Sequence, residues 1–243
     1  AKVSMGRLEG ARGDKSAGED WFVDALADLD QLEQTDFVLK QNIQYELAIS
    51  KARQQRTQEA VGLLREVLRD RESTLGMDHP STLSTVGTLG AVLANSGDLS
   101  SAEPCFQRVY EGQLRTLGAE HPSTLSTLTN LGNMQVEQGK IELAFATAQM
   151  GLALAMRVRG PDDQFTHALQ RLMARVLMNK GDYEEAQELA QRAVDGAVQI
   201  YGENSGHTLL SLDMLLQVLE AKGDAEGAQA VQDRVDRISR GDS

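Results

Sequence analysis

A nine-residue phrase occurs twice in this chain, and its spacing limits the folds that the chain can adopt. Residues 75–83 are Leu-Gly-Met-Asp-His-Pro-Ser-Thr-Leu, and residues 117–125, 42 positions later, are Leu-Gly-Ala-Glu-His-Pro-Ser-Thr-Leu. Self-similarity at a fixed period of roughly 20 to 50 residues is the sequence signature of repeat architectures. The chain is therefore expected to consist of stacked copies of one structural unit.

Two single-residue markers keep the same phase along the chain. A glycine recurs every 42 residues as Gly97, Gly139, Gly181 and Gly223. An alanine recurs at the same interval as Ala60, Ala102, Ala144, Ala186 and Ala228. The five alanines predict five units. The first unit is atypical, because Gln55 and Arg56 stand where the other units have the glycine and the residue after it.

Each marker suits a particular place in a helix-turn-helix unit. A glycine after a helix adopts the left-handed backbone conformation without a Cβ clash. The proline of the His-Pro pair suits the first turn of a helix, where its missing N–H is not needed. Apolar residues between the markers recur at helical spacing. We therefore expect helix pairs near 37–54 and 57–74, 81–96 and 99–116, 123–138 and 141–158, 164–180 and 183–200, and 206–222 and 225–240.

The composition agrees with an all-helical chain. Hydrophobic residues make up 41% of the sequence, but aromatic residues make up only 4%. This mixture favours helix packing and is atypical of β-sheets, which are enriched in aromatic and β-branched residues. A long coiled coil is disfavoured as well, because a glycine every 42 residues would interrupt a continuous heptad seam.

The net charge narrows the choice of partners. The formal charge is -12, and no basic stripe accompanies it, so nucleic acid and anionic membrane surfaces are not expected partners. No stretch approaches the roughly 18 consecutive apolar residues of a spanning helix, so membrane insertion is not expected. The remaining class of partner is another protein or a peptide.

Cysteine usage bears on the compartment. Cys105 is the single cysteine, which excludes an internal disulfide and a disulfide-stapled secreted fold. An intracellular location is therefore expected, with the cytoplasm and an organelle interior (plastid or mitochondrion) both open. The first residue is Ala1, which removal of an initiator Met or of a targeting segment would equally produce.

These residues resemble a known family. The spacing of small and large residues is similar to that of the tetratricopeptide repeat. The 42-residue period, the Leu-Gly-x-x-His-Pro-x-Thr-Leu phrase and the Ala102-Glu103-Pro104 sequence look like its kinesin-light-chain-like branch. The resemblance implies an all-α fold, a right-handed superhelical solenoid of five helix-turn-helix repeats over residues 37–240, with a tail at 241–243.

The resemblance also implies a binding face. In such solenoids the first helix of each unit lines a concave surface. The register carried over from that family places these side chains there: Thr88, Asn95, Thr129, Asn130, Asn133, Arg171 and Arg175. Asparagine amides both donate and accept, so they suit an extended peptide. The two arginines lie one turn apart and suit a carboxylate. Leu172 and Met214 take the position equivalent to Asn130 in later units.

The N-terminal region differs from the repeats. Residues 1–18 form a polar, glycine-rich arm that should be disordered alone. Residues 19–36 are acidic, with an apolar stripe that includes Trp21 and Phe22. We expect this segment to form an amphipathic helix that caps the first repeat. Two alternatives are a docking helix for another protein, with Trp21 and Phe22 as contacts, and self-occupation of the groove.

No pattern for chemistry accompanies the repeats. His79 and His121 lie at equivalent loops of different units, and no pair of histidines has the spacing of a zinc site. Cys105 is expected to be a buried small residue. We therefore expect no catalytic residues, no metal and no cofactor. The leading hypothesis is a non-catalytic scaffold that binds a partner segment. The alternatives are a structural or assembly subunit of a large complex, organellar for example, and an enzyme regulator.

Overall fold

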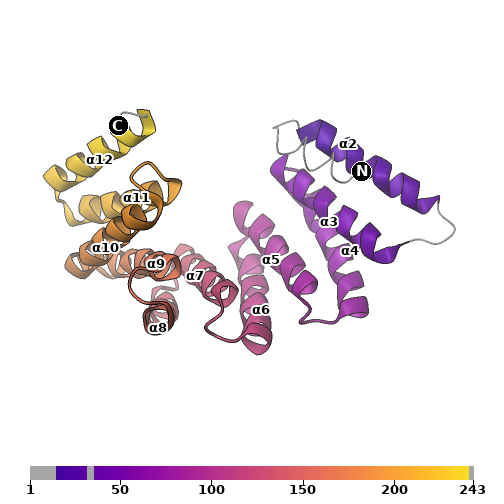
Figure 1. Cartoon of the computed structure of the whole chain (residues 1–243), viewed down its shortest axis with the longest axis horizontal. Helices are drawn as coiled ribbons and strands as arrows, with labels where there is room; N and C mark the ends of the chain where they lie inside the picture. Colours follow the sequence, from indigo (N-terminus) through magenta and orange to yellow (C-terminus); the bar gives the residue numbers. More distant parts are fainter. Residues whose placement is uncertain (1–14, 32–35, 241–243) are drawn as a thin grey trace. The chain divides into compact units, whose positions relative to one another are not determined.

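The computed structural model describes residues 15–31 and 36–240. All regular structure within these residues is helical (Figure 1). Most of the expected N-terminal arm, residues 32–35 of the acidic segment and the tail at 241–243 lie outside the described residues.

The expected helix pairs are present, and every boundary agrees with its prediction to within one residue. They follow an additional N-terminal helix, and together the helices are α2 (Lys15–Asp30), α3 (Phe37–Arg53), α4 (Thr57–Leu75), α5 (Pro80–Asn95), α6 (Leu99–Leu117), α7 (Pro122–Glu137), α8 (Ile141–Arg159), α9 (Gln164–Lys180), α10 (Tyr183–Tyr201), α11 (Gly206–Lys222) and α12 (Ala225–Arg240). Consecutive helices contact each other from α2 to α5 and from α7 to α12, and first helices also contact the first helix of a neighbouring repeat, as in α7 with α9 and α9 with α11. The fold is therefore an all-α repeat fold, as predicted.

The chain divides into two compact units, which we call unit 1 (residues 1–116) and unit 2 (residues 117–243). In unit 2, small residues allow the helices to approach closely. Ala144, Ala148 and Ala155 of α8 are fully buried. A Cβ added to Gly151 would lie 2.7 Å from a methyl carbon of Leu169, so the close contact between α8 and α9 requires a glycine there.

The His-Pro phrase begins a helix in both of its copies. Pro80 and Pro122 are the first residues of α5 and α7. The Nδ1 atom of His79 accepts a hydrogen bond from the Ser81 backbone N–H at 3.1 Å, and His121 does the same for Ser123. These two histidines therefore act as N-terminal helix caps, which accounts for their repetition.

The turn glycine follows the first helix of a helix-turn-helix repeat. Gly181 has φ 89° and its N–H donates to the Met178 carbonyl at 3.1 Å. The α3–α4 turn has Gln55 instead, with φ 63°, and it is the one described residue other than glycine in this conformation. Its Cβ makes this conformation costly by about 1 kcal/mol.

Helix α2 packs against α3 in unit 1 (Figure 1). It begins at Lys15, four residues before the expected acidic helix. Phe22 is 3% exposed and lies in a cluster with Leu29, Ile43 and Leu47. Phe22 is thus covered in this cluster, whereas Trp21 is half-buried and is the more accessible of the two aromatic residues.

Helix α8 has a long apolar stretch. An 18-residue window of this 19-residue helix has a mean hydropathy of 1.3, which by length and composition alone is enough to cross a membrane, and 28% of that window is buried. A core helix of a repeat protein passes the same test, and α8 buries the alanine face described above against α7 and α9. Its opposite face is exposed.

Candidate functional site

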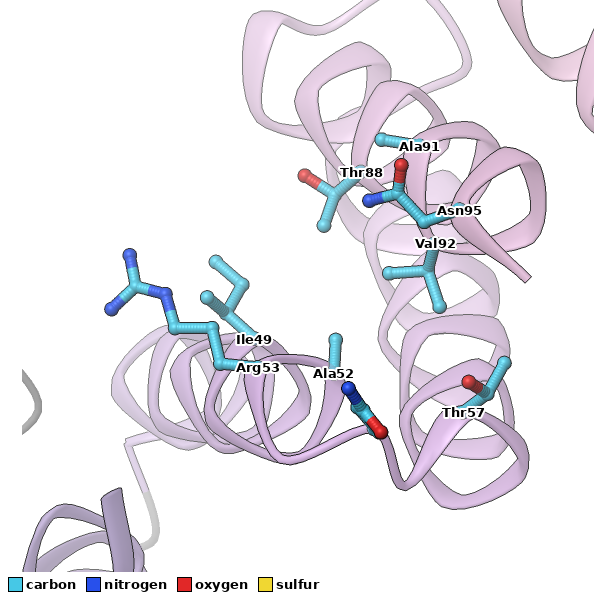
Figure 2. Close-up of a pocket in the computed structure, with 9 residues that line it drawn as sticks. Ile49, Ala52, Arg53, Thr57, Thr88, Ala91, Val92 and Asn95 are labelled. Carbon is cyan, nitrogen blue, oxygen red and sulfur yellow. The ribbon is translucent and has the colours of Figure 1, made fainter. Parts of the chain in front are cut away.

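Unit 1 contains a cavity of about 580 Å³ between α3 and α5 (Figure 2). Two of the predicted groove residues, Thr88 and Asn95, line it. The complete lining is Ile49, Ala52, Arg53, Gln55, Thr57, Thr88, Ala91, Val92 and Asn95. None of the described α2 residues lines this cavity.

The cavity exists because small residues face it. Ala52 of α3 and Ala91 of α5 leave space where larger side chains would meet (Figure 2). Ile49 and Val92 add apolar surface, and Thr57, Thr88 and Asn95 add hydrogen-bonding groups at the edges. This combination of apolar lining and a few polar groups is typical of ligand sites in proteins.

The polar groups differ in how firmly they are held. The Thr88 hydroxyl lies 2.7 Å from the Tyr45 hydroxyl, which also lies 3.3 Å from the Ser84 hydroxyl. The Thr88 side chain is therefore oriented by α3. Asn95 is exposed at the C-terminal end of α5, where its side-chain amide can both donate and accept hydrogen bonds.

Gln55 belongs both to the cavity lining and to the strained turn between α3 and α4. Its backbone N–H donates to the Ala52 carbonyl at 3.0 Å, and the neighbouring Arg56 N–H donates to the Lys51 carbonyl at 3.0 Å. The left-handed conformation at Gln55 puts a long amide side chain on the cavity wall, where glycine would leave none. Strained residues of this kind occur preferentially at binding sites.

An ionic cluster, which we call the turn brace, fixes this turn. Its members are Glu19 of α2, Lys51, Arg56 and Glu59. The Lys51 ammonium lies 2.7 Å from Glu19 and 2.9 Å from Glu59, and the Arg56 guanidinium bonds both carboxylates. Helix α2 is thereby tied to the turn that carries Gln55.

The turn brace shifts the pKa values of its carboxyl groups. The hydrogen bonds from Arg56 and then Lys51 lower the pKa of Glu59 to about 2. Burial raises the pKa of Glu19, but hydrogen bonds from Lys51, Gln54 and Arg56 outweigh it and hold that pKa below its ordinary value. Both carboxylates are thus ionised at neutral pH.

Arg71 of α4 supports the same region from inside unit 1. It is 4% exposed and donates to the Ser81 carbonyl, the Thr85 hydroxyl and the Asn42 side-chain oxygen at 2.8–3.0 Å. Its guanidinium carbon also lies 5.0 Å from the centre of the Tyr45 ring. Burial lowers the pKa of Arg71. This side chain links α4 to α3 and α5, the two helices that form the cavity.

The remaining predicted groove residues lie in unit 2. On α7, Asn130 is exposed, and Asn133 is half-buried. Thr129 is half-buried, and its hydroxyl donates to the Leu125 carbonyl at 2.9 Å, one turn earlier in the same helix. Asn130 is therefore the most accessible of the three.

The two predicted arginines do not form a joint carboxylate site. Arg171 donates to the Ser211 hydroxyl of α11 at 3.3 Å. Arg175 instead donates to the Asn133 side-chain oxygen of α7 at 3.4 Å and lies 3.6 Å from Glu137. The two guanidinium groups thus turn to opposite neighbours, and burial lowers the pKa of Arg171.

The expectation that Leu172 and Met214 face the groove is wrong. Leu172 is 1% exposed and Met214 is 6% exposed, and both belong to the core of unit 2. Gly132 explains the position of Leu172, because a Cβ there would lie 2.4 Å from a Leu172 methyl carbon. The leucine fills the space that the glycine leaves.

Other groups with chemical potential have structural surroundings. His167 is 3% exposed and packs on Gly196, where an added Cβ would meet its ring. Cys105 is half-buried rather than buried, and burial raises the pKa of its thiol. Among the described residues, no three His, Cys, Asp or Glu side chains are arranged to hold a metal ion.

The paired helices, the turn glycine and the 42-residue period define a tetratricopeptide-like repeat protein. Residues 43–243 match the MalT-like tetratricopeptide repeat region, and the chain belongs to this family. Repeats of this kind are generally non-catalytic. No curated protein matches the chain.

Solved structures of similar fold include a kinesin light chain with nearly identical TPR-like repeats from Podosopora anserina. It is 27% identical with a TM-score of 0.67, over 80% of this chain and 92% of that one. BtubC from P. vanneervenii is 17% identical with a TM-score of 0.72, over 92% and 90%. The Rap conjugation gene regulator of plasmid pLS20, in complex with the Phr* peptide, is 15% identical with a TM-score of 0.60, over 98% and 74%.

Val92 of α5 was not predicted to line the cavity, and neither were five residues of α3, of α4 and of the turn between them. They are Ile49, Ala52, Arg53, Gln55 and Thr57. One sequence feature pointed to them, namely the missing glycine at Gln55 and Arg56. It was attributed to the atypical character of a terminal unit rather than to a site.

Proposed function

We propose that the chain is a protein-binding scaffold whose unit 1 cavity binds an extended segment of a partner protein. The observation that carries the proposal is the cavity itself, a space of about 580 Å³ with an apolar lining, polar edges and a strained Gln55 on its wall. Ligand pockets in proteins span roughly 300 to 1,000 Å³. The space therefore suits one or two side chains of a peptide.

The lining chemistry favours a peptide over a small ion. The amides of Asn95 and Gln55 each donate and accept, so they pair with a peptide backbone whatever its side chains. Ile49 and Val92 offer apolar contact to one bound side chain. Each such contact contributes a small part of the affinity, and the ordered Thr88 hydroxyl reduces the entropy lost on binding.

A solved structure of similar fold supports this use of the fold. The Rap regulator noted above was solved with a bound peptide, although at 15% identity it bears on the fold alone. Fold likeness does not assign a ligand. The proposal therefore depends on the cavity, and the sequence of the bound segment is a matter for experiment.

A peptide-library selection on the whole chain tests the proposal. The affinity of a selected peptide is measured for the wild type and for Ala91→Arg, which fills the cavity. We expect a loss of at least about 30-fold. The matched control is Ala230→Arg, the same exchange at an exposed alanine of α12, which should leave the affinity unchanged. Equal affinities of Ala91→Arg and wild type would contradict the proposal.

A further inference from the structure

Helix α8 exposes an apolar stripe on the side opposite its buried alanines. Leu143 is 49% exposed and Met150 is 50% exposed, and Ala146 and Ala153 between and beyond them are exposed too. We call these four residues the α8 stripe. Their spacing of three, four and three residues is that of a coiled-coil seam, in which one helix pairs with another.

Other second helices in the chain have charged residues at the equivalent positions. On α10, 42 residues later, the four positions hold Glu185, Glu188, Arg192 and Asp195, and all four are exposed. Helix α4 has Glu59, Gly62, Glu66 and Arg69 there, also exposed. The repeat thus tolerates charge on this surface, and fold stability does not explain the apolar residues of α8.

An acidic residue lies at one end of the stripe and a basic residue lies at the other. Glu142 lies beside its first residue, and Arg157 follows its last one at the next seam position. No Asp, Glu, Lys or Arg occurs between them. Their side chains are 82% and 71% exposed, and their ion pairs, to Lys180 and Glu120, are surface contacts of small energetic value.

This pattern is complementary to itself when a second α8 runs antiparallel. With Met150 opposite Met150 of the second copy, Leu143 of one chain faces the aliphatic part of Arg157 of the other, and the guanidinium reaches Glu142. A two-fold axis creates this contact twice. A parallel arrangement would instead place like charges together at both ends.

We propose that the α8 stripe is a self-association surface on which two copies of this chain pair through antiparallel α8 helices. The stripe extends over about 15 Å at 1.5 Å per residue. A helix stripe of this size buries less than the roughly 800 Å² per partner of standard interfaces. The dimer is therefore weak and reversible.

Sedimentation equilibrium of the whole chain at increasing concentration measures dimerisation. Variants that reverse the charge of Glu142 or Arg157 test the antiparallel pairing. Glu142→Arg and Arg157→Glu each place like charges together at both ends of the antiparallel pair. Each should weaken dimerisation at least tenfold. The double variant Glu142→Arg with Arg157→Glu restores the complementarity and should return to within about threefold of the wild type. Double-variant dimerisation as weak as that of the single variants would overturn the antiparallel pairing.

A second pair of variants separates the surface from the fold. Leu143→Glu and Met150→Arg copy the residues that α10 has at these positions, so helix content by circular dichroism should stay unchanged. Dimerisation should be lost in both. A wild type that is monomeric up to about 1 mM, or a dimer that survives both changes, would overturn the proposal. Flotation of the wild type, but not of Leu143→Glu, with phosphatidylcholine vesicles would also overturn it in favour of a membrane contact.

Discussion

At the scale of single residues, Gln55 has a strained backbone conformation that places its side chain on the cavity wall. Its φ of 63° lies in the left-handed region that Gly97, with φ 86°, occupies in the equivalent turn of the next repeat. The left-handed region costs a residue with a Cβ about 1–2 kcal/mol, and glycine loses part of that advantage through its greater freedom in the unfolded chain. The net cost of glutamine here is therefore small but real.

The exchange Gln55→Gly should raise the free energy of unfolding by up to about 1 kcal/mol and weaken binding of a selected peptide, because the strain and the amide disappear together. Urea denaturation and a peptide titration measure the two effects. The reverse exchange Gly97→Gln should lower stability by a similar amount, since no neighbour compensates for it. A less stable Gln55→Gly chain would refute the assignment of strain.

His167 is a titratable side chain that is almost completely buried. It takes the position that Leu83 and Leu125 have in earlier units. Its ring is buried on Gly196, and its Nδ1 has no hydrogen-bond partner among the described residues. Burial lowers the pKa of His167, against the raising effects of a hydrogen bond to Pro161 and of Asp162 and Asp163; Arg171 adds to the lowering.

Because the folded-state pKa of His167 lies below 6.5, the unfolded chain binds the proton more readily. The contribution of neutral His167 to stability is complete above pH 6.5 and is lost as the pH falls through the lowered value. The exchange His167→Leu should remove this loss. Urea denaturation at about pH 8 and about pH 5 should show a smaller decrease in the variant than in the wild type. Equal decreases would contradict this role.

At the scale of helices, α2 is held to unit 1 by an apolar cluster and by the turn brace. Glu19 is 14% exposed at its side chain and contacts two cations, one of which, Lys51, is 11% exposed. A carboxylate that is largely buried between two cations contributes more than a surface pair does. The N-terminal helix is thus a structural part of the cavity's unit.

The exchange Glu19→Gln should destabilise the docking of α2 by about 1–2 kcal/mol, because neutral glutamine leaves Lys51 and Arg56 with one carboxylate. Trp21 is the single tryptophan, so its fluorescence in a denaturation experiment reports on α2. The control Asp20→Asn removes an exposed charge from the same helix and should have little effect. Similar midpoints for both variants would argue against the turn brace.

The same ion pairs predict an acid effect. The pKa of Glu19 is lowered in the folded chain, so its contribution is present above its ordinary value of 4.5 and is lost as the pH falls through the lowered value. The midpoint difference between wild type and Glu19→Gln should therefore decrease in acid. A difference that grows with acidity would have the wrong sign.

At the scale of the whole molecule, the repeat pattern was sufficient to predict the helices. The turn glycine, the His-Pro pair and the close-packing alanine each act locally, so the boundaries of the repeat helices followed from the sequence to within one residue, whereas α2, outside the repeats, begins four residues earlier than expected. The binding residues were predicted less well. Thr88 and Asn95 line the cavity, but the directions of Arg171 and Arg175 depend on hydrogen bonds to neighbouring helices that no local pattern encodes.

Two further features could not be predicted from the sequence for a similar reason. Leu172 is buried because a glycine on another helix leaves room for it, which depends on tertiary contact. The α8 stripe becomes evident only once the exposed side of α8 is known, because its residues alternate in sequence with equally apolar core residues. Both cases concern which face of a helix is covered.

The central claim is that the cavity between α3 and α5 binds a peptide, and methyl NMR tests it most directly. On addition of a selected peptide, the methyl signals of Ile49, Ala52, Ala91 and Val92 should shift together. The methyl signals of Leu143 and Ala153, on the α8 stripe, should stay in place. Shifts confined to methyl groups outside the cavity would contradict the account.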